Sequence, residues 1–463
     1  MKDMTTGSPF KLLVYFSIPL LAGNIFQQSY AMADTIIVSR TLGREALAAL
    51  SATMPIGFML IGSLIGLTNG FAVVTGHRFG AKDIDGVRRS IVTSTLISAA
   101  IVVVGTLLCV LSAGAILKAM QTPDTVFPDA LIYLRVIFWG IGTIVLYNLI
   151  SSILRAFGDS KTPFIFLIVC SILNIVLDLV FILSFGWGIG GAAWATAISQ
   201  AVAGIGCVVY GAIRYPILRV PREYWRLSWS DVWQHLRIGV PMAVQFIVIA
   251  IGSIIIQISL NKLGDVTMAA YAVVARVDQL AIQPFLSIAI ALSAFVAQNY
   301  GVKDIPRINQ GMRCCVKIVL FISITGGILM IAFNQPLIHL FLRADDITEE
   351  VMRQAGTFIF ANAIFYPMLA LLFVFRHTLQ GMGRVTAPML TCAAEVVVRA
   401  FVAWVLIERL GYIGVCFANI LPWCVAVTML FSMLVPVMRK ELREYRLRTT
   451  YFAPHKKPED SAG

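Results

Sequence analysis

Residues 163–184 read PFIFLIVCSILNIVLDLVFILS, a 22-residue apolar run whose one charged side chain is Asp178. About 20 such residues, folded as a helix, cross the hydrocarbon core of a bilayer. The whole chain shares this character, because 59% of its 463 residues are hydrophobic and only 13% are charged. Soluble domains have about 45–50% apolar and about 25% charged residues. The sequence therefore predicts an all-α polytopic membrane protein.

Twelve apolar runs are long enough to span a bilayer, separated by charged or Gly/Pro-containing breaks. They cover residues 11–38, 47–75, 90–117, 128–152, 163–184, 189–212, 236–260, 268–298, 314–334, 354–376, 388–407 and 413–436. Most of the 36 Lys and Arg residues fall in segments that share a side with the N-terminus. Basic loops stay cytoplasmic, so we expect both termini in the cytoplasm. The net charge of +12 then reflects topology and does not imply nucleic-acid binding.

Three motifs recur in the second half of the chain at a nearly constant distance. LGREALAA at 42–49 recurs as LGDVTMAA at 263–270, and FGAKDI at 79–84 recurs as YGVKDI at 300–305, both 221 residues later. A Leu-x3-Gly-x4-Pro pattern at 154–163 recurs at 379–388, 225 residues later. The chain is thus predicted to hold an N-terminal six-helix bundle (1–213), a cytoplasmic linker (214–235), a C-terminal six-helix bundle (236–440) and a cytoplasmic tail (441–463).

The even number of spans in each half sets the symmetry. Both halves cross the membrane in the same direction, so a pseudo-two-fold axis along the membrane normal should relate the two bundles. Such repeats are typical of alternating-access transporters, in which substrate passes between the halves.

Two carboxylates interrupt the apolar runs of the first bundle, Asp34 and Asp178. An ionised group at this depth costs a few kcal/mol or more and usually faces a cavity or a cation. Asn174 lies four residues before Asp178 and hence on the same helix face. Counting along the spans places Thr196 and Tyr133 at a similar depth, in the outer half of the membrane.

The oxygen atoms of these side chains suit a hard cation such as Na⁺, or a shared proton. The alternative is that each acid is merely paired or hydrogen-bonded within the bundle. Candidate partners are Arg135, Arg155 and the neighbouring hydroxyl groups.

Several motifs together resemble a known family. They are Pro19…Asp34 followed by LGREALAA at 42–49, LRAFGDSKTP at 154–163, Asn174-x3-Asp178, and GGAAWAT at 190–196. In this combination, over nearly all twelve spans, the chain resembles the multidrug and toxic compound extrusion (MATE) transporters. The resemblance implies a V-shaped pair of bundles that exports amphipathic, often cationic, compounds in exchange for H⁺ or Na⁺. It also implies a multi-pass protein of the bacterial plasma (inner) membrane.

The family's cation site in the N-terminal half matches Asp34, Asn174, Asp178 and Thr196, with Tyr133 nearby. Pro19 removes a backbone hydrogen bond from the first span, which makes this span the one most able to bend. The hypothesis is that binding of H⁺ or Na⁺ at the two acids bends the first span and evicts the cargo.

The second half departs from this pattern, since the positions equivalent to Asp34, Asn174 and Asp178 hold Ile255, Arg399 and Ala403. Coupling is therefore expected to be asymmetric. Two oppositely charged pairs stand there instead: Glu395 with Arg399, four residues apart, and Arg276 with Asp278. Each pair either neutralises itself and holds the fold, or Glu395 meets a cationic substrate or relays protons. The candidate substrate cavity comprises Asn24, Gln27, Tyr30, Met54, Gln245, Gln283, Tyr366, Glu395 and Arg399.

Two other classes of function compete. A lipid-linked oligosaccharide flippase of the same superfamily is the main alternative, and it should present several basic residues to pyrophosphate. An enzyme is disfavoured because the five His are scattered and form no metal or nucleophile set. We expect no cofactor, no metal beyond the coupling ion, and no ATP, since no glycine-rich phosphate loop is present. The expected partners are the lipid bilayer and small amphipathic drugs or metabolites, and the protein is expected to act as a monomer.

Overall fold

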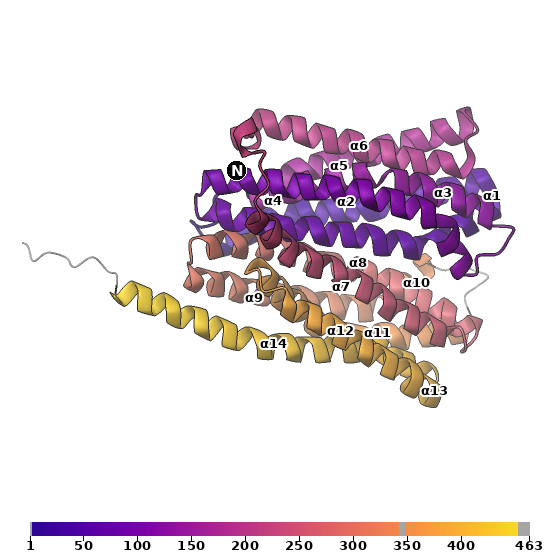
Figure 1. Ribbon diagram of the computed structural model, residues 1–463. Coiled ribbons are helices and arrows are strands. Elements are labelled where there is room, and N and C mark those ends of the chain that lie inside the picture. The colour runs from indigo at the N-terminus through magenta and orange to yellow at the C-terminus, as the bar shows by residue number, and fades with distance from the viewer. Residues whose placement is uncertain (1, 342–347, 452–463) are drawn as a thin grey trace, which may run out of the picture.

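The computed structural model describes residues 2–341 and 348–451, and every regular element in these ranges is a helix. Residues 342–347 and the last part of the predicted tail, 452–463, lie outside the described residues. Figure 1 shows α1 to α6 in the upper half of the molecule and α7 to α14 in the lower half. The boundary between the two halves lies in the segment between α6 and α7.

The first half contains α1 (Pro9–Gly80), α2 (Ile84–Ala119), α3 (Phe127–Trp139), α4 (Ile141–Ala156), α5 (Lys161–Leu179) and α6 (Gly188–Arg214). The second half contains α7 (Trp229–Leu260), α8 (Asp265–Gly301), α9 (Ile305–Ala332), α10 (Asn334–Phe341), α11 (Glu349–Gly381), α12 (Thr386–Phe401), α13 (Ile407–Leu410) and α14 (Tyr412–Tyr451). Helix α7 begins before the predicted end of the linker, and α14 continues into the predicted tail.

The predicted spans map onto these helices with two differences. Predicted spans one and two form one element, α1, with a break at Gly43 (φ 86°, ψ −165°). A straight helix of 72 residues would be about 108 Å long, whereas a bilayer core is about 30 Å thick, so α1 contains two spans. Predicted span four is bent by 45° between α3 and α4. With the other nine apolar spans, the chain crosses the membrane twelve times.

The backbone repeats the sequence duplication. Gly264, between α7 and α8, has φ 88° and ψ 174°, nearly the conformation of Gly43 in the first half. Only glycine adopts this region without strain. Lys82 and Lys303 both take positive φ values, 59° and 61°, at the ends of equivalent helices. Each is followed by an aspartate whose side chain caps the next helix.

The bundles meet through reciprocal contacts about the pseudo-two-fold axis. A Cβ atom at Gly80 of α1 would collide with the backbone of Gln298 in α8, and one at Gly301 of α8 would collide with the backbone of His77 in α1. His77 and Gln298 are themselves 221 residues apart, so each glycine meets the repeat equivalent of the other's partner. This reciprocity is what two-fold symmetry requires.

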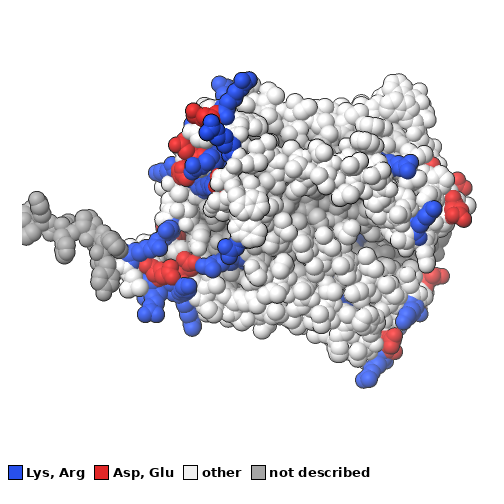
Figure 2. Space-filling model, in the orientation of Figure 1, with Lys and Arg blue, Asp and Glu red and all other residues white. Residues whose placement is uncertain are grey.

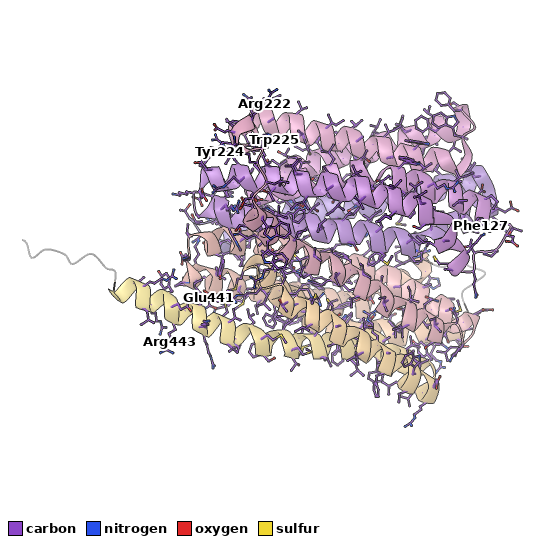
Figure 3. All side chains as sticks on the ribbon, in the orientation of Figure 1. Phe127, Arg222, Tyr224, Trp225, Glu441 and Arg443 are labelled. Atoms are coloured by element: carbon purple, nitrogen blue, oxygen red, sulfur yellow. The ribbon has the colours of Figure 1, made fainter. Side chains whose placement is uncertain are left out.

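The basic end of the molecule is the end that holds the N-terminus, the segment between α6 and α7, and the last turns of α14. Figure 2 shows blue side chains gathered there, a broad uncharged band beside it, and a smaller mixed set at the opposite end. In Figure 3, Arg222, Trp225 and Arg443 lie at the basic end and Phe127 at the opposite end. This is the charge distribution of a multi-pass membrane protein.

The N-terminal segment, residues 2–7, contacts both bundles at the basic end, and we call it the strap. The Lys2 amide donates to the Phe157 carbonyl of the first bundle (3.0 Å). The Met4 amide donates to Gln298 Oε1 of the second bundle (2.8 Å), and the Met4 carbonyl accepts from Asn299 and Arg307. The Met4 side chain is 1% exposed and belongs to the core of the second bundle. The strap therefore bridges the bundles where they approach most closely.

Toward the opposite end the bundles separate. The surface is hollowed between the upper and lower bundles toward the right-hand end of Figure 2. Asn24 of α1 donates to Ser287 of α8 (3.1 Å), and Gln279 of α8 donates to Gln28 of α1 (3.1 Å). Beyond this pair, the described residues form no further hydrogen bond between α1 and α8. The molecule is thus closed at its basic end.

Candidate functional site

Asp178 lies on α5 inside the first bundle and has an exposed fraction of 0%. Neither carboxylate oxygen has a hydrogen-bond partner among the described residues. Asn174, one turn earlier, is also buried; it donates weakly to Thr196 Oγ1 of α6 (3.4 Å) and leaves its own Oδ1 without a donor. The i, i+4 spacing thus brings Asp178 and Asn174 together, as predicted from the sequence.

The second carboxylate of this site comes from α1. The Asp34 side chain is the immediate neighbour of Asp178, and its Oδ1 is also buried without a partner. Tyr133 of α3 and Tyr30 of α1 lie near the Asp34 carboxylate. Gln200 of α6, a residue that the sequence reasoning did not single out, neighbours Tyr30 and also has an unpartnered buried oxygen. Four helices therefore contribute to one polar cluster.

The unsatisfied atoms of this acidic cluster are all acceptors: Asp34 Oδ1, Asn174 Oδ1, both oxygens of Asp178, and Gln200 Oε1. Buried polar atoms are normally hydrogen-bonded, because an unmet acceptor in an apolar medium costs about 1–3 kcal/mol. Several unmet acceptors in one place fit a cation or a proton. The described residues contain no group of three or more His, Cys, Asp or Glu that could hold a metal ion. Two carboxylates with neutral oxygens suit H⁺ or a monovalent cation such as Na⁺.

The acids of the cluster have no basic partner in the structure. Arg135 is exposed on α3, and Arg155 lies elsewhere, at the bundle interface. Neither forms an ion pair in the described part of the chain. Pairing with an arginine therefore does not account for these buried carboxylates.

Asp278 of α8, a buried carboxylate of the second bundle, has a very different environment from Asp178. Tyr366 donates to its Oδ1 (2.6 Å), while Asn362 (2.7 Å) and Asn419 (3.4 Å) donate to its Oδ2. Asp278 does not pair with the exposed Arg276, because residues two apart lie on different faces of a helix. This acid is satisfied by neutral donors, in contrast to Asp178.

Glu395 of α12 pairs with Arg376 of α11, and both side chains are buried. The predicted partner, Arg399, forms no ion pair among the described residues and packs beside Gly252 of α7. Sequence spacing indicates only neighbours along one helix, so it could not predict Arg376, which lies on a different helix from Glu395.

The residues of the predicted substrate cavity differ in exposure. Gln27 and Met54 are exposed, and Asn24 and Tyr30 are partly buried on α1. Gln283 is buried and donates to the Gln279 carbonyl, and Tyr366 is buried against Asp278.

A small cavity of about 60 Å³ does lie between the bundles. Its walls come from α1, α4, α7, α8 and α11, and they comprise Asn69, Ala72, Val73, Ser152, Arg155, Ala156, Met242, Ile290, Ser293, Ala294, Ala297, His377 and Gln380. Gln245 stands behind this wall and accepts a hydrogen bond from Gln380 (3.0 Å). The sequence places Arg155 near the basic face but offers no sign of the cavity, which forms only when the two halves pack together.

Two repeated bundles around a central interface, with an unpaired acid pair inside one of them, are the arrangement of a membrane transporter. The MatE family model matches residues 19–180 and 241–405, which is most of the chain. The chain belongs to this family, as the sequence motifs predict.

Named relatives and solved structures agree with this assignment. The chain is 30% identical to the probable multidrug resistance protein YpnP of Bacillus subtilis, over 82% of this chain and 84% of that protein. It is 32% identical to the probable multidrug resistance protein YoeA of the same organism, over 72% and 74% of the two chains. The fold matches a multidrug resistance MATE family transporter of the MOP superfamily in an outward-facing conformation (TM-score 0.88, 24% identity, 95% and 98% covered).

Proposed function

We propose that this protein is a secondary active exporter of amphipathic compounds, driven by inward movement of H⁺ or Na⁺ through the acidic cluster of the first bundle. The carrying observation is that Asp34 and Asp178 lie together inside the first bundle without a basic partner among the described residues. Three of their four carboxylate oxygens are buried and accept no hydrogen bond from a described residue. A bilayer-embedded acid pair of this kind requires a cation or a proton to lower its free energy. The coupling ion and the cargo then stabilise different conformations of the same chain.

The acidic cluster and the moving interface are connected through α1. Asp34 lies on the same helical segment as Pro19, Asn24 and Gln28, and the last two bind α8 of the second bundle. A cation that draws Asp34 toward Asp178 pulls this segment toward the first bundle. The segment then shifts relative to α8, and the cargo between the bundles loses part of its wall. Pro19, which is buried in α1, is the proposed bending point.

The basic end is proposed to face the cytoplasm of a bacterial cell, which places both described chain ends there. The closed basic end and the hollowed opposite end then correspond to a state that faces outward. The route between the bundles lies within one chain, so transport is expected of a monomer.

The cargo is proposed from the relatives' names. Multidrug export is supported by YpnP and YoeA. A relative from Shewanella oneidensis, 24% identical over 81% of this chain, is named as a FAD transporter, so the family also holds a carrier of another kind of cargo.

The test is dye transport in proteoliposomes, with pH and Na⁺ gradients imposed separately. Wild-type protein should move dye under one of the two gradients. Asp34→Asn and Asp178→Asn should lose gradient-driven transport, because an amide neither binds a proton at neutral pH nor attracts a cation. Asp124→Asn, the same change at an exposed position, should behave as wild type. Normal transport by both cluster variants would refute the proposal.

A further inference from the structure

Arg155, in the small cavity between the bundles, has no anionic partner among the described residues. Its Nη2 donates to Ser152 Oγ (2.7 Å) and to Asn69 Oδ1 (3.2 Å), both neutral oxygens. No Asp or Glu lies within ion-pair distance in the ranges that the structure describes, and none lines the cavity. Arg155 is thus a partly buried cation whose guanidinium is held in place by an amide and a hydroxyl group.

Two other arginines with mostly buried side chains form ion pairs. Arg376 pairs with Glu395, and Arg78 pairs with Asp231, and in both pairs the side chains are mostly buried. Removing a charged group from water without a counter-charge costs several kcal/mol. Arg155, like Arg399, forms no ion pair among the described residues, and Arg155 lines the cavity between the bundles.

The surroundings of Arg155 are already arranged around its charge. Ser152 donates its own proton to Asn69 Oδ1 (2.9 Å), so both groups turn oxygen lone pairs toward the guanidinium. This leaves Nε and Nη1 without a protein acceptor among the described residues. A guanidinium with two free N–H groups binds a carboxylate or phosphate through two parallel hydrogen bonds.

The opposite wall of the cavity belongs to the second bundle. The polar groups there are Ser293 of α8 and His377 and Gln380 of α11. Met242 and Ile290 supply apolar surface. The volume of about 60 Å³ has room for about four water molecules, or for the head group of a larger compound. An anion bound here would contact both bundles and would therefore report on their closure.

We infer that this cavity is an anion-binding subsite at the inner end of the transport path, and that the cargo carries a carboxylate or phosphate group that binds Arg155. The inference rests on the proposed function only in that the cavity lies on the route between the bundles. It narrows the cargo from amphipathic compounds in general to amphipathic anions and zwitterions. The apolar part of the cargo extends along Met242 and Ile290 toward the opposite end.

The test uses two dyes that share one scaffold. Rhodamine 110 carries a free carboxylate, and rhodamine 123 is its methyl ester. Binding to the purified full chain is measured by fluorescence polarisation, which does not depend on transport. The wild-type protein should bind rhodamine 110 about tenfold or more tightly than rhodamine 123, since charge-assisted bidentate hydrogen bonds are the strong ones. R155Q should abolish this preference, and R155K should retain part of it.

R135Q, at an exposed arginine of α3, is the matched control and should keep the full preference. Equal affinity of the wild type for the two dyes, or a preference that persists in R155Q, would overturn the inference. If R155Q fails to fold, the wild-type ratio and the R155K ratio still decide. Transport of both dyes under an ion gradient tests the proposed function separately, because an exporter without an anion preference would move the ester equally well.

Competition identifies the natural source of the anionic group. Inorganic phosphate that displaces rhodamine 110 at fixed ionic strength supports a soluble anion. Displacement by short-chain phosphatidic acid, but not by phosphatidylcholine, supports a lipid head group. Either displacement should be lost in R155Q, and a displacement that survives in R155Q would contradict a site at Arg155.

Discussion

The reciprocal glycine contacts at the basic end predict what a single methyl group does to the conformational equilibrium. In Gly80→Ala, the new Cβ would lie 2.6 Å from the carbonyl carbon and 2.7 Å from the Cα of Gln298, with the carbonyl oxygen closer still. These are backbone atoms, so no side-chain rotation relieves the overlap. Within a helix, alanine by itself is about 0.5–1 kcal/mol more favourable than glycine. Any weakening of the closed state must therefore come from the contact between the bundles.

Overpacking of this kind costs about 1–3 kcal/mol. A shift of this size changes the ratio of open to closed basic ends by about 5- to 150-fold. The pseudo-two-fold symmetry adds a quantitative requirement. Gly301→Ala meets the backbone of His77 and should shift the same equilibrium by a similar amount.

The assay is labelling of Ala294→Cys in the cavity between the bundles with a membrane-impermeant maleimide, applied to inside-out vesicles and read by mass spectrometry. Reading the label site by site keeps the eight native cysteines from confusing the result. Both glycine variants should raise the labelling rate. Gly57→Ala on α1, where a Cβ would meet nothing within 4 Å, should leave it unchanged. Labelling at the wild-type rate in both variants would show that these contacts do not hold the basic end closed.

Three further predictions concern the buried groups. Glu395→Gln should destabilise the protein by about 3–5 kcal/mol, because it leaves Arg376 buried without its counter-charge, and thermal unfolding in detergent should show a clear loss; an unchanged midpoint would contradict the pairing. Tyr366→Phe removes a donor to Asp278 and should cost about 1.5–3 kcal/mol in the same measurement, while a neutral result would mean that Asp278 does not depend on this bond. Met4→Ala should loosen the strap, since the side chain is 1% exposed, and should raise maleimide labelling of the cavity; unchanged labelling would show that the strap does not contribute to the seal.

Much of the fold could be predicted from the sequence because its causes are local. Apolar runs of membrane-spanning length gave the spans, and the recurring motifs gave the duplication. The 221-residue offset reappears in the backbone, where Gly43 and Gly264 share one conformation. The continuity of α1 across the first two spans was not visible, because a glycine break in a helix and a loop between helices have similar sequences.

The site was predictable only where its residues share a helix or carry a charge in an apolar run. Asp34, Asn174 and Asp178 met that condition, and the structure brings them together. The partners of Asp278 and Glu395 did not, since Tyr366 and Arg376 come from other helices, and packing alone selects them. The cavity at Arg155 was invisible for the same reason, because both bundles contribute to its walls.

Binding of the coupling ion to Asp34 and Asp178 of the first bundle can be measured without a cargo. Thermal unfolding of the purified protein is followed while Na⁺ replaces K⁺ at constant ionic strength, and separately while the pH is lowered from 8 to 6. An ion that binds only the folded protein stabilises it increasingly as the concentration of that ion rises. The prediction is that Na⁺ or protons raise the unfolding temperature of the wild type and of Asp124→Asn but do not raise that of Asp178→Asn. An Asp178→Asn protein that responds like the wild type would contradict it.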